Sequence, residues 1–370
     1  MTLLSNEDLR QLATPRAGPC ITITLPTHRD PTHGAQDALQ LRTLLEEVER
    51  QVTLGGPDRE RLLAPLRDLV EERAFWRHQD QGLALFRAPD LLALHRLPGS
   101  VAATASANDR FRLRPLLPFL RAGSRYLLLT LAQNHVALWE GDLTSLRPVD
   151  LPPLPRSMHE ALGEEWRLRY LGAHSQGHGA LVFHGHGAPS EDTKEDVTRF
   201  FRHVDEGLWP YLRDQERPLI LAGVEYYHPL FRQITRYRHL AGEGLTGNVE
   251  RDAPAQLLEK VRPLAERLAH VREAEVLEEL DRAGRSGRAA RDLRAIARAA
   301  VQGRVHTLLL AEGATVSGGC LDPASGDVRE GEGDLLEELS EAVLLRAGAV
   351  RSLPAGRLPD GLPCLARLRW

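Results

Sequence analysis

The chain of 370 residues is 42% hydrophobic, 26% charged and 5% aromatic, which is typical of globular domains and excludes a disordered chain. No window approaches the ~18 uninterrupted apolar residues of a membrane helix. Residues 1–8 carry no basic region or long apolar segment, so we expect no signal peptide and a cytoplasmic protein. The net charge of −4 excludes a uniformly basic nucleic-acid binder, and three widely spaced cysteines argue against a disulfide framework or a Cys-based zinc site.

The length predicts more than one domain, because a domain usually has about 100–200 residues. Changes of pattern fall at two places: Pro115 and Pro118 precede a new set of strands, and another unit ends near Asn248. We therefore expect three domains of mixed α/β and α+β class, with boundaries near residues 120 and 250. Their predicted ranges are 1–120, 121–250 and 251–370.

The first domain is predicted to be α+β. Residues 21–25 alternate apolar and hydroxyl side chains like a half-buried strand, which Pro26 stops. Two helices follow, and the second begins at Asp58. Their apolar stripes are Leu41, Leu44, Leu45, Val48 and Val52 on the first, and Leu62, Leu66 and Leu69 on the second. Residues 83–86 and 91–94 predict a hairpin, and 101–105 a further strand.

The loop at residues 27–37 is a possible N-terminal site. It carries His28 and Arg29, followed by Asp30, His33 and Asp37. Polar side chains on a loop at the end of a strand are well placed to bind a ligand. The alternative is a solvated turn with no ligand.

The second domain begins with an apolar strand at 126–131 and a hairpin partner at 136–139. After a loop-rich stretch with a helix near 158–167 comes a Gly/His-rich loop, residues 172–189. The predicted elements that follow are a helix at 192–213, a strand at 218–223 and a helix at 226–234. The helix at 192–213 has carboxylates in its first turn, where the helix dipole favours them.

The Gly/His-rich loop is the main candidate site. Five glycines permit positive φ angles and the close approach of another molecule, and the histidines between them can donate, accept or bind metal. We expect a mobile loop; the alternative is a plain surface connection. Arginines on the following helix are placed to meet phosphates. The candidate RNA- or ribosome-binding residues are His174, Gln176, Gly177, His178, Gly179, Arg199 and Arg202.

A metal site in this loop is an alternative. His184 and His186 are two apart and would share one face of a strand, with His174, His178 and Asp192 nearby. No HExxH pattern is present, and a flexible loop is a poor cage. Phosphate-loop, dinucleotide-binding and Gly-x-Ser-x-Gly patterns are absent as well. We therefore expect no bound metal, no cofactor and no catalytic residue.

The third domain alternates helices and strands, which predicts an α/β/α sandwich. Its first helix begins at Pro254, and Gly284, Ser286 and Gly287 are expected to end it near residue 282. Its predicted apolar stripe is Leu257, Leu258, Val261, Leu264, Leu268, Val271 and Leu280. The later elements are a helix at 291–301, strands at 305–310 and 314–316, a turn at 322–327, a helix at 335–345 and strands at 349–353 and 364–370.

The order of these parts resembles the bacterial archaeo-eukaryotic release factor family, third subgroup, which is related to class I peptide release factors and Pelota. Leu25-Pro26-Thr27-His28-Arg29 and the helix after it resemble that subgroup's N-terminal domain. Residues 126–141, 200–213 and 219–223 resemble the release-factor middle domain. Residues 297–313, from Ala297 through Gly303 to Gly313, resemble the third domain, which is similar to a kink-turn RNA-binding ribosomal-protein fold.

The resemblance implies a protein that works at the ribosome or on tRNA. Release factors carry Gly-Gly-Gln in the middle-domain loop, which enters the peptidyl-transferase centre. Here the corresponding loop reads His174-Ser175-Gln176-Gly177-His178-Gly179, without the Gly-Gly step. We therefore expect a ribosome-associated factor in rescue, stress response or hibernation that does not release peptides. The alternatives are a metal-dependent hydrolase using the histidines, and a protein-interaction adaptor without RNA contact.

Overall fold

The structure is a computed structural model, and it describes residues 4–121, 123–132, 135–150, 155, 157–162 and 191–370. The chain divides into two compact units, residues 1–122 with 272–370 (unit 1) and residues 123–271 (unit 2). Both units mix helices with sheets, so the predicted α/β and α+β class is confirmed. No helix in the described ranges is long and apolar enough to cross a membrane.

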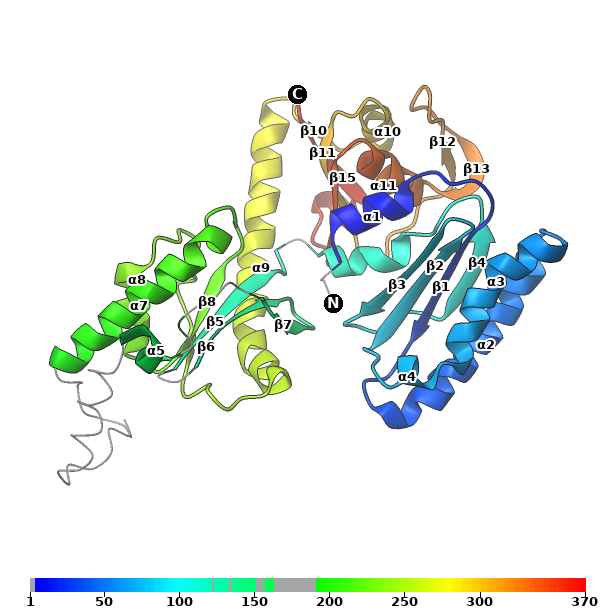
Figure 1. The fold of residues 1–370 in the computed structure, drawn as a ribbon. Helices are drawn as coiled ribbons and strands as arrows, with labels where there is room; N and C mark the ends of the chain where they lie inside the picture. The colour runs from blue at the N-terminus through cyan, green and yellow to red at the C-terminus, as the bar shows by residue number, and fades with distance from the viewer. Residues whose placement is uncertain (1–3, 122, 133–134, 151–154, 156, 163–190) are drawn as a thin grey trace. The chain divides into compact units, whose positions relative to one another are not determined.

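The N-terminal part of unit 1 is an antiparallel sheet of order β3-β2-β1-β4 covered on one face by two helices (Figure 1). Apolar residues of β1 and β2 alternate toward the helices, and each helix contributes a stripe at helical spacing. The elements are α1 (Asn6–Ala13), β1 (Cys20–Pro26), η1 (Pro31–His33), α2 (Gly34–Gln51), α3 (Gly56–Glu71), α4 (Arg73–Trp76), β2 (Gly82–Ala88), β3 (Leu91–Leu97), β4 (Thr104–Asn108) and η2 (Arg114–Leu120).

The C-terminal part of unit 1 contains a mixed sheet of order β10-β15-β11-β14 and a separate hairpin, β12-β13. Strand β11 pairs parallel with β14 and antiparallel with β15. The elements are β10 (Ala289–Ala290), α10 (Leu293–Val301), β11 (Val305–Ala311), β12 (Ser317–Leu321), β13 (Val328–Asp334), α11 (Leu335–Leu345), β14 (Ala349–Leu353), η3 (Pro359–Gly361) and β15 (Cys364–Leu368).

One hydrophobic core joins these two parts of unit 1. It contains Phe86 and Leu116 from the N-terminal part and Ile296 and Leu339 from the C-terminal part, all fully buried. Hydrogen bonds support the same contact: Arg10 Nε donates to the carbonyl of Leu344 at 3.0 Å. The two stretches of sequence therefore form one packed body.

Unit 2 is a five-stranded sheet of order β7-β6-β5-β8-β9, with helices on both faces (Figure 1). Leu127, Leu129 and Leu131 of β5 pack with α7 and α8, while Tyr126 and Leu128 face the core that α9 covers. The elements are β5 (Tyr126–Ala132), β6 (His135–Gly141), β7 (Leu146–Pro148), α5 (Met158–Leu162), α7 (Glu191–Leu212), β8 (Leu219–Gly223), α8 (Tyr227–Ile234), β9 (Leu245–Thr246) and α9 (Pro254–Arg285).

Helix α9 passes from unit 2 into unit 1, because the division at residues 271 and 272 falls inside it. Its first part buries Leu257 and Val261 in unit 2, and its last part buries Leu280 in unit 1. Val271, predicted to be buried, is 56% exposed because it lies where one set of packing contacts ends and the next begins. The helix also continues through Gly284, beyond its predicted end.

Two strand predictions are corrected by the structure. The strand expected at 101–105 begins at Thr104, where pairing with β1 starts. The short strand expected at 314–316 lies instead at Ser317–Leu321 and pairs with β13, a strand that the sequence pattern did not indicate.

Candidate functional site

The predicted loop residues His174, Gln176, Gly177, His178 and Gly179 lie outside the described residues. The same is true of the proposed metal ligands His184 and His186, and of the loop 172–189 as a whole. Within the described ranges, no group of three or more His, Cys, Asp or Glu side chains lies close enough to hold a metal ion.

Arg199 and Arg202 lie on α7, the helix that follows this loop, and both are exposed. The opposite face of α7 is fixed in the core of unit 2 by Val197, Phe200 and Phe201. Residues three apart on a helix are neighbours on its surface, so the two guanidinium groups can approach the same ligand.

A cluster that the sequence did not reveal lies farther along α7. Asp205 is buried and accepts three hydrogen bonds from the chain after α8: from Thr235 Oγ1 at 2.9 Å, and from Arg236 through Nε at 2.9 Å and its backbone N–H at 3.3 Å. The Arg236 guanidinium carbon also lies 4.7 Å from the ring centroid of Trp209. Arg236 is thereby held against Asp205 and Trp209, which lie one and two turns after Arg202 on α7.

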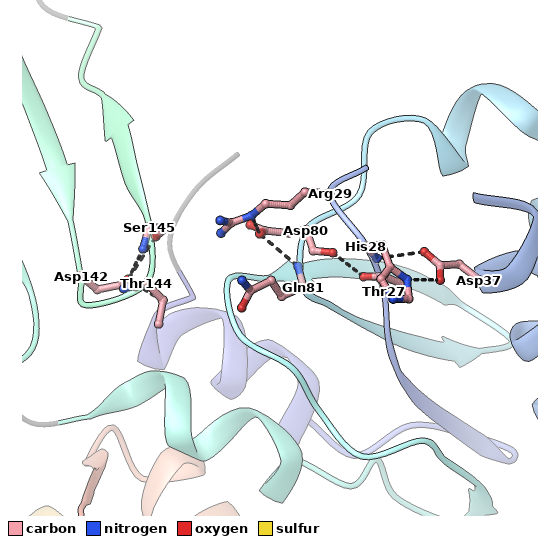
Figure 2. Close-up of polar contacts among 9 residues, drawn as sticks. All are labelled: Thr27, His28, Arg29, Asp37, Asp80, Gln81, Asp142, Thr144 and Ser145. Atoms are coloured by element: carbon pink, nitrogen blue, oxygen red, sulfur yellow. Dashed lines mark hydrogen bonds and ion pairs between the residues drawn. The ribbon is translucent and has the colours of Figure 1, made fainter. Parts of the chain in front are cut away.

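The possible N-terminal site is a histidine held by a buried carboxylate (Figure 2). Asp37 lies in the first turn of α2 with its side chain 1% exposed. Its Oδ1 lies 2.7 Å from His28 Nδ1, and its Oδ2 accepts the backbone N–H of His28 at 2.9 Å. The His28 side chain is 44% exposed. With Nδ1 engaged by the carboxylate, Nε2 is the nitrogen that remains for a ligand.

A second imidazole lies beside the first. The rings of His28 and His33 stack at 4.5 Å between centroids, with 21° between their planes. Asp30 caps the short turn between them by accepting the N–H of Thr32 at 2.9 Å, and this hydrogen bond holds the pKa of Asp30 below its ordinary value. The loop is therefore an ordered turn with two adjacent imidazoles.

Arg29 is held on the other side of this turn. Its Nε lies 2.7 Å from Asp80 Oδ1, which also accepts the N–H of Gln81 at 3.0 Å. Thr27 is buried, and its hydroxyl donates to the carbonyl of Asp80 at 2.7 Å (Figure 2). The segment before β2 thus fixes the end of β1, and His28 and Arg29 are brought together on one ordered loop.

Figure 2 also shows a polar turn of unit 2. Asp142 Oδ1 accepts the N–H groups of Thr144 and Ser145, both at 2.8 Å, and the Thr144 hydroxyl at 2.7 Å. These bonds close the turn between β6 and β7, which is a structural role.

The burial of Asp37 could have been found from the sequence. Asp37 precedes Leu41 by four residues and Leu44 by seven, so it lies on the apolar stripe of α2. A carboxylate on a buried stripe needs a partner, and His28 is the titratable group that the turn brings back to it.

Residues 125–304, just under half of the chain, match the family model described as bacterial archaeo-eukaryotic release factor family 3. The resemblance predicted from the sequence is confirmed over this range, which relates the chain to the release factors. No curated protein matches the chain.

Solved structures that match include three of release factors and Pelota. Archaeal translation termination factor aRF1 is 14% identical, with 99% of each chain covered and a TM-score of 0.24. Pelota of Archaeoglobus fulgidus is 12% identical over 100% of this chain and 94% of that one, with a TM-score of 0.32. An archaeal Pelota in a model of its ribosome-bound state with ABCE1 is 13% identical over 100% and 95%, with a TM-score of 0.40.

Proposed function

We propose that this chain, whose residues 125–304 match bacterial archaeo-eukaryotic release factor family 3, is a ribosome-associated factor that acts in ribosome rescue, stress response or hibernation. The family match carries the proposal, because that family is related to factors that act in translation. A protein of this kind would act in the cytoplasm and bind the ribosome or tRNA.

The proposal excludes peptide release by this chain. The loop sequence His174-Ser175-Gln176-Gly177-His178-Gly179 lacks the Gly-Gly step that precedes the glutamine in release factors. We propose that the loop contacts RNA instead, through Gln176 and His178, with Gly177 and Gly179 allowing close approach.

Arg199 and Arg202 would then bind phosphates next to the loop. Both are exposed on the outer side of α7, and both lie close in sequence to the end of the loop. Arginine suits phosphate because its guanidinium can make two parallel hydrogen bonds. His28 and Arg29 of unit 1 are proposed as a further RNA contact, since each is held in place by a carboxylate.

Sedimentation of the purified chain with bacterial ribosomes through sucrose tests this proposal. At about 0.05 M salt we expect co-migration with a subunit or the whole ribosome. Binding should be weaker at about 0.2 M, because added salt reduces the free energy gained when counterions leave the RNA. Arg199→Ala/Arg202→Ala should weaken binding roughly tenfold or more and make it less salt-dependent.

The matched control is Arg282→Ala/Arg285→Ala, which removes the same charge from two exposed arginines of α9. It should bind as the unaltered chain does. If the chain co-migrates with neither a subunit nor the whole ribosome at either salt concentration, ribosome association is refuted. Co-migration together with hydrolysis of peptidyl-tRNA would retain the ribosomal role and refute the absence of peptide release.

A further inference from the structure

A pocket of about 530 Å³ in unit 1 lies outside the residues that match the family. Its walls come from the first turns of α2, from η1 and from the end of α3 with α4. Pockets of about 300–1,000 Å³ are the size that small molecules use. The residues that line it include Leu39, Arg42, Val70, Arg73 and Arg77.

The rim of the pocket is positively charged. Arg42 forms an ion pair with Glu71 at 2.6 Å, so one of the three arginines is neutralised. Arg73 and Arg77 are exposed, and neither pairs with a carboxylate among the residues that the structure describes. Two unneutralised guanidinium groups remain. Arg73 begins α4, and Arg77 is the C-cap residue of α4 and still has helical backbone angles, so the two lie one turn apart.

Apolar side chains also line the pocket. Leu39 lines it with 59% of its surface exposed, an unusual exposure for a leucine on a helix whose other leucines are buried. Trp76 forms part of the wall, is 3% exposed, and donates from Nε1 to the carbonyl of Leu69 at 2.8 Å. Gly34 allows α2 to approach it, since a Cβ there would lie 3.1 Å from Trp76.

We propose that this pocket binds an organic phosphate with an apolar body, namely a nucleotide. The phosphate would be held by Arg73 and Arg77, whose planar forks match its oxygens, and the base would cover Leu39 and Val70. Binding would remove the exposed leucine from water. The nucleotide is either free or the 5′-terminal residue of an RNA, and the two sources present the same chemistry to the pocket.

Isothermal titration of the full chain at about 0.15 M salt tests the proposal with adenosine monophosphate, adenosine and inorganic phosphate as probes. We expect the monophosphate to bind more tightly than either of its parts. Arg73→Ala/Arg77→Ala should weaken its binding at least tenfold. Leu39→Ser should weaken binding of the monophosphate and leave that of inorganic phosphate unchanged.

The control is Arg50→Ala/Arg61→Ala, which removes two exposed arginines of α2 and α3 that do not line the pocket. It should change the Kd less than twofold. The proposal is overturned if no probe binds, if adenosine binds as well as the monophosphate, or if the control weakens binding as much as the pocket variant. Circular dichroism would verify that each variant is folded.

Two hexanucleotide RNAs of one sequence, with and without a 5′-phosphate, are used as competitors to distinguish a free nucleotide from the 5′ end of an RNA. Competition by the phosphorylated RNA alone identifies an RNA end as the ligand, and competition by neither identifies a free nucleotide. Ribosome binding by the Arg73→Ala/Arg77→Ala variant is measured separately from nucleotide binding. The nucleotide inference and the proposed ribosomal function can therefore each fail while the other stands.

Discussion

Asp37 holds the turn after β1 through both of its carboxylate oxygens. Asp37→Asn keeps the shape and removes the charge, which weakens the hydrogen bonds to the ring and backbone of His28. Loss of charge-assisted hydrogen bonds at a buried site should lower the free energy of unfolding by about 1–3 kcal/mol, measured by urea denaturation.

The control for this prediction is Asp58→Asn. Asp58 pairs with Arg61 on the surface of α3, where the two side chains are 67% and 77% exposed. An exposed pair of this kind contributes about 0–1 kcal/mol. Equal losses in the two variants would mean that the buried pair has no special role.

Glu337 gives unit 1 a pH-dependent stability. Burial raises the pKa of its carboxyl, although the group accepts the N–H of Leu113 at 2.6 Å. The folded state therefore binds the proton more tightly than the unfolded state. This contribution is complete below the ordinary glutamate pKa of about 4.3 and is lost as the pH rises through the raised value.

Glu337→Gln removes that titration. Between pH 4 and pH 7, the unfolding free energy of the variant should therefore rise relative to that of the unaltered chain. Urea denaturation of both proteins at the two pH values measures the difference. A difference that stays constant, or that moves the other way, would contradict the raised pKa.

At the level of single residues, the sequence predicts which side chains belong to the N-terminal turn but not how they are arranged. His28, Arg29 and Asp37 were recognised as polar residues at the end of a strand. Their pairing depends on α2 folding back so that Asp37 meets His28, and on Asp80, about fifty residues later, reaching Arg29. Contacts of this range are set by tertiary packing, which local patterns do not encode.

Among the elements, strand β6 of unit 2 ends on a glycine that the packing requires. A Cβ at Gly141 would lie 2.7 Å from the ring of Tyr126 and 2.9 Å from Leu146. Tyr126 is 1% exposed and cannot move aside. Gly141→Ala should therefore destabilise unit 2 by roughly 1–3 kcal/mol, measured by thermal or urea unfolding.

Gly242→Ala is the comparison, because a Cβ at Gly242 meets nothing within 4 Å. It should leave stability within about 0.5 kcal/mol. A similar loss at both positions would contradict the role of the contact with Tyr126, because Gly→Ala without such a contact reduces the entropy of the unfolded chain and should not destabilise.

Elements with strong periodicity were predicted well from the sequence, and elements stabilised mainly by backbone pairing were not. The stripe of α2 and the apolar run of β8 identify a helix and a buried strand without ambiguity. Strands β12 and β13 contain Gly-Gly-Cys and Glu-Gly-Glu-Gly, which show no apolar alternation, so only their mutual hydrogen bonding makes them strands.

For the whole molecule, two compact units predict unfolding in more than one step. Each unit has its own hydrophobic cores, so their stabilities need not be equal. Differential scanning calorimetry should show at least two transitions. Gly141→Ala should lower the temperature of one and Asp37→Asn that of the other. A single transition that both substitutions shift equally would contradict this division.

The division into three consecutive domains, 1–120, 121–250 and 251–370, stays a prediction. Contacts divide the chain differently, because residues 1–122 and 272–370 share one core. Local patterns mark where elements change along the chain, whereas the sharing of a core between distant segments depends on their packing.

The shared core of unit 1 also imposes an order on biosynthesis. Unit 2 is complete once residue 271 has left the exit tunnel, while the apolar face of the N-terminal sheet, with Phe86 and Leu97, still lacks its C-terminal partners. At about 5–20 residues per second, translating residues 272–370 takes roughly 5–20 s. During that interval unit 2 can already be folded while unit 1 is incomplete, and chaperones that bind exposed apolar surface would find their target on the N-terminal sheet.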